Sequence, residues 1–229
     1  MLPRTLETEV MDSAEEARDY DSMDHAEVNR RFVEDLLSFR SRVREALDVG
    51  TGTARIPIEL CMRLPEAHVV GIDLADHMLA LANENVKARN LSGRISLEKR
   101  DAKSAGWPEG RFEVTMSNTI LHHIPDPLDP LREMWRLTAK GGATFIRDLA
   151  RPRSITEIDG LVRKYAGEPA GSDASLEGSQ ARQRALFEAS LHAALTLEEI
   201  REQAKEIGAP ASAVTMTSDR HWTLAHVKT

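Results

Sequence analysis

Two glycines separated by a single residue mark where this sequence is able to do chemistry. Gly50 and Gly52 follow the largely apolar segment 46–49, and a helical pattern opens at Arg55. Glycine permits a turn with positive φ and the close approach of a ligand, and the start of a helix presents free N–H groups. Asp73 ends a second apolar segment about 20 residues further on, where a carboxylate can accept hydrogen bonds from both hydroxyls of a ribose. The spacing predicts a nucleotide-like ligand at the edge of a parallel sheet.

The elements that must position this turn alternate between strand and helix patterns. Asp129 and Pro130 are expected to cap the helix at 129–138, and the pair Gly141-Gly142 to stop it. Strands that alternate with helices require a parallel sheet with right-handed crossovers. We expect strands at 45–49, 67–72, 95–99, 112–118 and 143–148, and helices at 53–63, 76–88 and 129–138.

The alternation breaks between residues 151 and 195, which we expect to form a helical insertion. A capping box at Ser154 opens its first helix, and 179–194 forms its second. Another capping box, at Thr196, opens the last helix of the chain. The final two strands are separated only by a tight turn, so they must pair antiparallel. These strands are expected at 212–218 and 222–228.

Composition limits the classes of protein and partner. The chain has 229 residues and a formal net charge of −7, which disfavours tight binding to a nucleic-acid backbone. No segment approaches the roughly 18 consecutive apolar residues of a membrane helix, and the N-terminus has no apolar signal-peptide core. We therefore expect a cytoplasmic protein without a membrane partner. Cys61 is the single cysteine, which excludes an intrachain disulfide and a zinc site of several cysteines, and we predict no metal site.

The order of the polar motifs separates two kinds of nucleotide-binding protein. A dinucleotide-binding fingerprint needs a third glycine where Arg55 stands, which disfavours a dehydrogenase. The turn after Asp48, the acid Asp73, the sequence 100–102 (Arg-Asp-Ala) and the sequence 118–123 (Asn-Thr-Ile-Leu-His-His) occur in a different, recognisable order. In these motifs the chain resembles the class I S-adenosylmethionine-dependent methyltransferases, specifically the branch that contains the quinone-biosynthesis C-methyltransferases.

The resemblance covers residues 44–150, and by topology also the last helix and hairpin. It implies an α/β fold with a doubly wound, mostly parallel seven-stranded sheet of order 3-2-1-4-5-7-6, the last strand antiparallel. The helical insertion follows strand 5. The implied organisation is an N-terminal helical lid segment at 1–43 and an S-adenosylmethionine-binding domain at 44–229, with the insertion 151–195 as a cap.

The resemblance also implies which residues bind S-adenosylmethionine and its product, S-adenosylhomocysteine. The first turn would contact the methionine part, the acid after the second strand the ribose, and the residues after the third strand the adenine. The residues after the fourth strand would line the methionine end. The implied set is Asp48, Gly50, Thr51, Gly52, Asp73, Leu74, Met78, Asp101, Ala102, Asn118 and Thr119.

Few side chains need be catalytic, because transfer from a sulfonium is an in-line displacement that chiefly requires alignment and exclusion of water. His122 or His123 can serve as a general base, or pack beside the cofactor as hydrogen-bonded histidines. Tyr20 can close on the sulfonium as part of a lid, or belong to a solvated acidic leader. Further acceptor-side candidates at the carboxyl edge of the sheet are Arg147, Arg151, Tyr165, His192, His221 and Trp222.

We therefore expect a methyltransferase that acts on a small-molecule acceptor. The arginines near strand five suggest that this acceptor carries an anionic group. An RNA methyltransferase is a second interpretation, disfavoured by the charge and by the lack of an appended basic domain. A scaffold that binds the cofactor without catalysis is a third, disfavoured by the intact turn and acids.

Overall fold

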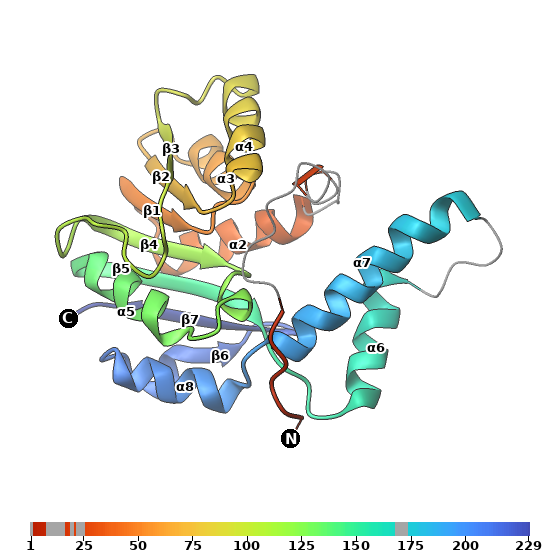
Figure 1. The fold of residues 1–229 in the computed structure, drawn as a ribbon. Coiled ribbons are helices and arrows are strands. Elements are labelled where there is room, and N and C mark those ends of the chain that lie inside the picture. The colour runs from red at the N-terminus through yellow and green to blue at the C-terminus, as the bar shows by residue number, and fades with distance from the viewer. Residues whose placement is uncertain (1, 8–16, 19–20, 22–25, 168–173) are drawn as a thin grey trace.

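Seven strands form one sheet in the computed structural model, which describes residues 2–7, 17–18, 21, 26–167 and 174–229 (Figure 1). The strand order is β3-β2-β1-β4-β5-β7-β6. The strands β1 to β5 pair parallel, and β7 pairs antiparallel with both β5 and β6, which confirms the predicted fold class. The strands are β1 (Glu45–Val49), β2 (His68–Asp73), β3 (Ile95–Lys99), β4 (Phe112–Asn118), β5 (Thr138–Leu149), β6 (Val214–Met216) and β7 (His221–Val227).

Helices cover both faces of the sheet. Successive side chains of a strand point to opposite faces, and Ala46 and Leu47 of β1 accordingly belong to different apolar clusters. The cluster with Ala46 includes side chains of α2, α3 and α4, whereas the cluster with Leu47 includes side chains of α5 and α8. The helices are α2 (Ala26–Phe39), α3 (Arg55–Arg63), α4 (Asp76–Ala88), α5 (Leu128–Leu137), α6 (Ile155–Ala166), α7 (Ala174–Ala193) and α8 (Leu197–Glu206), with short 3-10 turns η1 (Leu121–His123) and η2 (Ala211–Ala213).

The predicted cap of α5 and the predicted start of β5 are wrong. The helix α5 begins at Leu128, whose N–H donates to the Asp126 carboxylate at 3.1 Å, so Asp129 is not its cap. It ends at Leu137 without help from glycine, and β5 starts at the next residue. Gly142 lies inside this strand, where a Cβ would lie 2.7 Å from the carbonyl oxygen of Glu113. The two glycines lie where the register between β4 and β5 shifts, and they allow the close approach of the strands there. They do not stop a helix.

The predicted helical insertion is the pair α6 and α7, which projects from the end of the sheet (Figure 1). The pair shares a separate apolar cluster that includes Ile158, Val162 and Leu191. The helix α7 starts at Ala174, five residues before the predicted position. The predicted capping box at Thr196 is present in both directions. No helix among the described residues is both long enough and apolar enough to cross a membrane.

Candidate functional site

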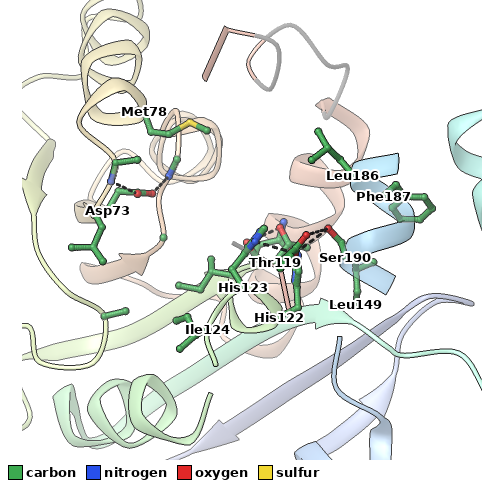
Figure 2. A pocket seen from close by; sticks show the side chains of 18 of the residues that line it. Asp73, Met78, Thr119, His122, His123, Ile124, Leu149, Leu186, Phe187 and Ser190 are labelled. Atoms are coloured by element: carbon green, nitrogen blue, oxygen red, sulfur yellow. Dashed lines mark hydrogen bonds and ion pairs between the residues drawn. The ribbon is translucent and has the colours of Figure 1, made fainter. Parts of the chain in front are cut away.

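A cavity of about 790 Å³ lies at the carboxyl ends of the parallel strands. One side is formed by residues that directly follow β1, β2, β3 and β4, and we name it the strand-end wall. The other side brings together Ile124, which follows η1, with residues of β5, the α6–α7 pair and the β6–β7 turn, and we name it the far wall. Figure 2 labels three of its residues, Ile124, Leu149 and Phe187. The strand-end wall is Gly50, Gly52, Asp73, Leu74, Met78, Asp101, Ala102, Asn118 and Thr119, and the far wall is Ile124, Leu149, Tyr165, Phe187, Arg220 and His221.

The first turn needs glycine because of its backbone and its neighbours. Gly50 has φ 71°, and a Cβ there would lie only 2.3 Å from Cγ2 of Ile120. Gly52 has φ 53°, and Ala54 also adopts positive φ, at 60°. The N–H groups of Gly50 and Thr51 both donate to the carbonyl oxygen of Ile72, which ties the turn to the end of β2.

The carboxylate of Asp73 is held in place by two backbone donors. Its Oδ2 accepts from the N–H of Gly52 at 2.8 Å, and its Oδ1 accepts from the N–H of Ala75 at 3.0 Å (Figure 2). Each carboxylate oxygen has more than one acceptor direction, so both can take further hydrogen bonds. Asp73 is therefore fixed at the cavity surface as an acceptor of hydroxyl donors.

Two of the predicted cofactor residues lie behind the turn. Asp48 is buried below it, and burial raises the pKa of its carboxyl to about 7. Asp48 and Thr51 line a neighbouring cavity of about 360 Å³, not the large cavity. Their position suits support of the turn better than direct contact with a ligand.

The remaining strand ends complete the strand-end wall. Asp101 accepts from the N–H of Lys103 at 2.9 Å, which holds the turn after β3. Thr119 adopts φ 59° and donates its N–H to the carbonyl oxygen of Arg147. Asn118 exposes no surface at its Oδ1, which has no hydrogen-bond partner among the described residues. A buried acceptor without a donor at a cavity edge fits a ligand that carries N–H groups.

His122 and His123 converge on one carboxylate at the far end of the cavity. His122 Nδ1 lies 2.6 Å from Oδ1 of Asp148, and its Nε2 lies 3.4 Å from Oε1 of Glu7. His123 Nδ1 lies 3.0 Å from that same oxygen of Glu7, and the two rings are tilted by 36° with their centroids 4.1 Å apart (Figure 2). The sequence predicted a site role for both histidines but not for Glu7, because no local pattern links residue 7 to a loop more than 100 residues away.

The charges in this cluster stabilise one another against burial. Burial alone lowers the pKa of His122, but the carboxylates of Asp148 and Glu7 raise it above its ordinary value. Burial alone raises the pKa of Asp148, but the charge and hydrogen bond of His122 hold it below its ordinary value. The ring of His122 is thus bound on both of its nitrogens by acidic partners.

Several predicted acceptor-side residues do not reach the cavity. Arg147 turns toward α2, where its Nη2 lies 2.6 Å from the carboxylate of Asp35. Arg151 is buried against α8, with Nη2 2.5 Å from Oε1 of Glu199. Trp222 is fully buried in the apolar core, and His192 is not among the cavity residues. The predicted lid residue Tyr20 lies outside the described residues.

Tyr165 and His221 do line the cavity, and the structure adds Arg220 between them. The Arg220 guanidinium lies 3.3 Å from the centre of the Tyr165 ring, and the Tyr165 hydroxyl donates to Asp219 at 2.7 Å. Burial lowers the pKa of His221 to about 4, so its imidazole is neutral at pH 7. The sequence placed the neighbouring His221 and Trp222 at this edge, which was the available signal for Arg220, but a charged residue in a tight turn also suits a solvated position.

Comparison with known proteins agrees with this geometry. Residues 46–142 match the family model described as a methyltransferase domain. The chain is 34% identical over 111 residues to a demethylmenaquinone methyltransferase of Deinococcus radiodurans, covering 48% of this chain and 45% of that protein. It is also 34% identical over 110 residues to the demethylmenaquinone methyltransferase of Geobacillus kaustophilus, covering 48% and 47%. The chain therefore spans about half the length of the curated relatives it matches.

Solved structures extend the likeness to the whole fold. A SAM dependent methyltransferase from Aquifex aeolicus superposes with a TM-score of 0.65 at 15% identity, covering 94% of this chain and 98% of that one. An O-methyltransferase family protein from Burkholderia thailandensis gives 0.64 at 17% identity, covering 90% and 57%. The chain has the fold of the class I S-adenosylmethionine-dependent methyltransferases. Over about half of its length, the chain is similar to demethylmenaquinone methyltransferases.

Proposed function

We propose that this protein transfers a methyl group from S-adenosylmethionine to a small-molecule acceptor. The observation that carries the proposal is the strand-end wall, in which residues of four separate strand ends meet at one cavity. Asp73 is the centre of this wall, since two backbone donors fix its carboxylate where a ribose would lie. Ligands of doubly wound sheets bind at this edge.

The residues present suit the cofactor. Asp73 would accept the ribose hydroxyls, while Asp101 and the Ala102 N–H would bind the adenine. The unpartnered Oδ1 of Asn118 would accept from the ammonium group of the methionine part. Bound S-adenosylmethionine supplies an electrophilic methyl group on its sulfonium. The protein's task is then to hold the acceptor in line with that methyl and to exclude water.

The far wall favours an acceptor with an apolar body and an anionic group. Ile124, Leu149 and Phe187 offer apolar surface, and Arg220 supplies a cation at the cavity edge. The Nη1 of Arg220 has no hydrogen-bond partner among the described residues. The proposal keeps the anionic group that the sequence suggested. Arg220, and not Arg147 or Arg151, is the cation that would bind it.

A general base at His122 or His123 stays a prediction. Both ring nitrogens of His122 already face carboxylates, and Nδ1 of His123 faces Glu7. The lid role of 1–43, the cap role of 151–195 and the cytoplasmic location also stay predictions. The net charge of −7 continues to favour a small molecule over RNA.

Methyl transfer is tested with S-adenosylmethionine labelled on its methyl group. Purified protein is incubated with a panel of apolar acceptors in matched anionic and neutral forms, and with tRNA. We expect label in at least one anionic acceptor, together with equimolar S-adenosylhomocysteine. Label in tRNA alone would favour the RNA methyltransferase, and binding of the cofactor with no transfer to any acceptor would favour the scaffold.

A further inference from the structure

We propose that Glu7, His122 and His123 form a binding site for one divalent transition metal ion at the edge of the cavity. Each residue offers one ligand atom, and these three atoms all lie within 4.8 Å of one another. Two imidazole nitrogens with one carboxylate oxygen are a donor set suited to zinc, iron(II) or cobalt(II). All three residues line the large cavity, so an ion here would have open positions for a ligand.

The distances agree with ligands that share one ion. Oε1 of Glu7 lies 3.4 Å from Nε2 of His122 and 3.0 Å from Nδ1 of His123. Ligand bonds of about 2.0 to 2.1 Å in a tetrahedral site place neighbouring ligand atoms about 3.3 Å apart. A simple hydrogen bond from His123 to Glu7 accounts for the shorter distance only.

A second carboxylate orients the His122 ring for this purpose. Asp148 is 1% exposed, and its oxygens accept from Nδ1 and the backbone N–H of His122 and from the N–H of Leu149. Because Nδ1 donates its N–H to Asp148, Nε2 points toward Glu7 and is the ring nitrogen that an ion could bind. Histidine ligands of metals are regularly held in this way by a carboxylate on the other ring nitrogen. Binding an ion would displace any proton on His122 Nε2 or His123 Nδ1 into solvent.

The charges near the cluster leave room for a cation. Two buried or half-buried carboxylates, Glu7 and Asp148, face the histidines, and Arg4 is the nearby permanent cation. The Arg4 guanidinium is committed to backbone oxygens, which include those of Ile124 and Ala193 at 2.9 and 2.7 Å. With both histidines neutral, Glu7, Asp148 and Arg4 together leave one negative charge, which a divalent ion would offset.

The N-terminal segment 2–7 holds the Glu7 carboxylate next to the two histidines. Besides the contacts of Arg4, the N–H of Thr5 donates to the carbonyl oxygen of His192 at 3.1 Å. Ser190 of α7 donates its hydroxyl to Oε1 of Glu7 at 3.3 Å (Figure 2). The site therefore joins the segment 2–7, the η1 turn and α7, which are distant in the sequence. No local sequence motif predicts such a site.

The ion's use rests on the proposed function. Next to an acceptor anion, a metal ion can bind one of its oxygens and fix its orientation. Binding of the ion itself does not depend on the cofactor. The two proposals are therefore open to separate tests.

The test starts with full-length protein stripped of metals by a chelator. Cobalt(II) is added, its visible d–d absorption is recorded, and bound metal is counted by mass spectrometry after gel filtration. We expect one ion per chain for the wild type, with loss of affinity of at least roughly tenfold in Glu7→Gln and in His123→Ala. His68→Ala, which removes an exposed histidine far from the site, is the matched control and should bind as the wild type does.

Absence of cobalt from the wild type would overturn the metal site. Equal binding by wild type and both ligand variants would overturn it as well, because the ion would then lie elsewhere. Calorimetry with S-adenosylhomocysteine on the same samples separates the proposals. A protein that binds the cofactor product but not cobalt keeps the proposed function, and one that binds cobalt but not the cofactor product loses it.

Discussion

The two walls of the cavity are built in opposite ways. The strand-end wall comes from consecutive βα units within residues 48–119, so each functional residue follows directly from its strand. The far wall joins β5, the α6–α7 pair and the β6–β7 turn, which are distant in the sequence. The first wall lies inside the matched family model, whereas residues beyond 142 lie outside it. In the proposed function, the wall inside the matched region holds the cofactor and the wall that extends beyond it holds the acceptor.

The Trp222→Ala substitution has the largest expected effect on stability. It tests whether Trp222 belongs to the core and not to the far wall. Trp222 is fully buried and its side chain belongs to the core beside β5. We expect the free energy of unfolding to fall by about 3 to 5 kcal/mol, as measured by urea denaturation. Trp222→Phe should lose less stability and keep the wild-type KM for the acceptor. A large rise in KM for Trp222→Ala with unchanged stability would instead indicate that Trp222 contacts the acceptor.

The Gly50→Ala substitution tests the strand-end wall. The added Cβ would meet Ile120 at 2.3 Å on a backbone with φ 71°, so we expect a loss of about 2 to 3 kcal/mol in stability. The double variant Gly50→Ala/Ile120→Ala removes the two closest atoms, Cγ2 and Cδ1, but leaves the Cβ of residue 120 at 3.0 Å and the backbone strain, so it should recover part of the loss. If the stability losses of Gly50→Ala and Ile120→Ala simply added in the double variant, contact with Ile120 would not be the reason for glycine at this position.

Both substitutions bear on what the sequence could predict. The order of strands and the turn at Gly50 follow from local patterns, and the structure has them where expected. The start of β5 could not be found in this way, because Thr138 already pairs with Phe112 of β4, five residues before the predicted start of the strand. Arg147 faces α2 since alternate residues of a strand point to opposite faces, and the sequence alone did not fix which face it would take. Glu7 depends on a tertiary contact that no local pattern encodes.

The pH dependence of stability tests whether Asp48 supports the turn from below. Its folded-state pKa of about 7 exceeds the ordinary value of 3.8, so the folded state holds this proton in a range where the unfolded state has lost it. Stability should therefore fall as pH rises between these two values, by at most about 1.4 kcal/mol per pH unit. Asp48→Asn should lack this slope in thermal denaturation between pH 5 and 7. An identical slope in the variant would assign the effect to other groups.

The Arg220→Gln substitution gives the smallest effect and tests the acceptor side alone. Loss of the guanidinium should raise KM for an anionic acceptor roughly tenfold, or about 1.4 kcal/mol, while the affinity for S-adenosylhomocysteine stays unchanged. Arg163→Gln, an exposed arginine of α6, is the matched control in the same region. A neutral acceptor that shows the same rise in KM would contradict an anion-binding role.

The most direct test of the account is calorimetric binding of S-adenosylhomocysteine to the wild type, Asp73→Ala and Asp129→Ala. Asp129 is an exposed acid of α5 and serves as the control. Hydrogen bonds to a charged group contribute about 1.5 to 3 kcal/mol each, so loss of the ribose carboxylate should weaken binding about a hundredfold. The account predicts one tight site in the wild type and in Asp129→Ala, and a weakened site in Asp73→Ala. Binding by Asp73→Ala as tight as that of the wild type, or no binding by the wild type, would contradict it.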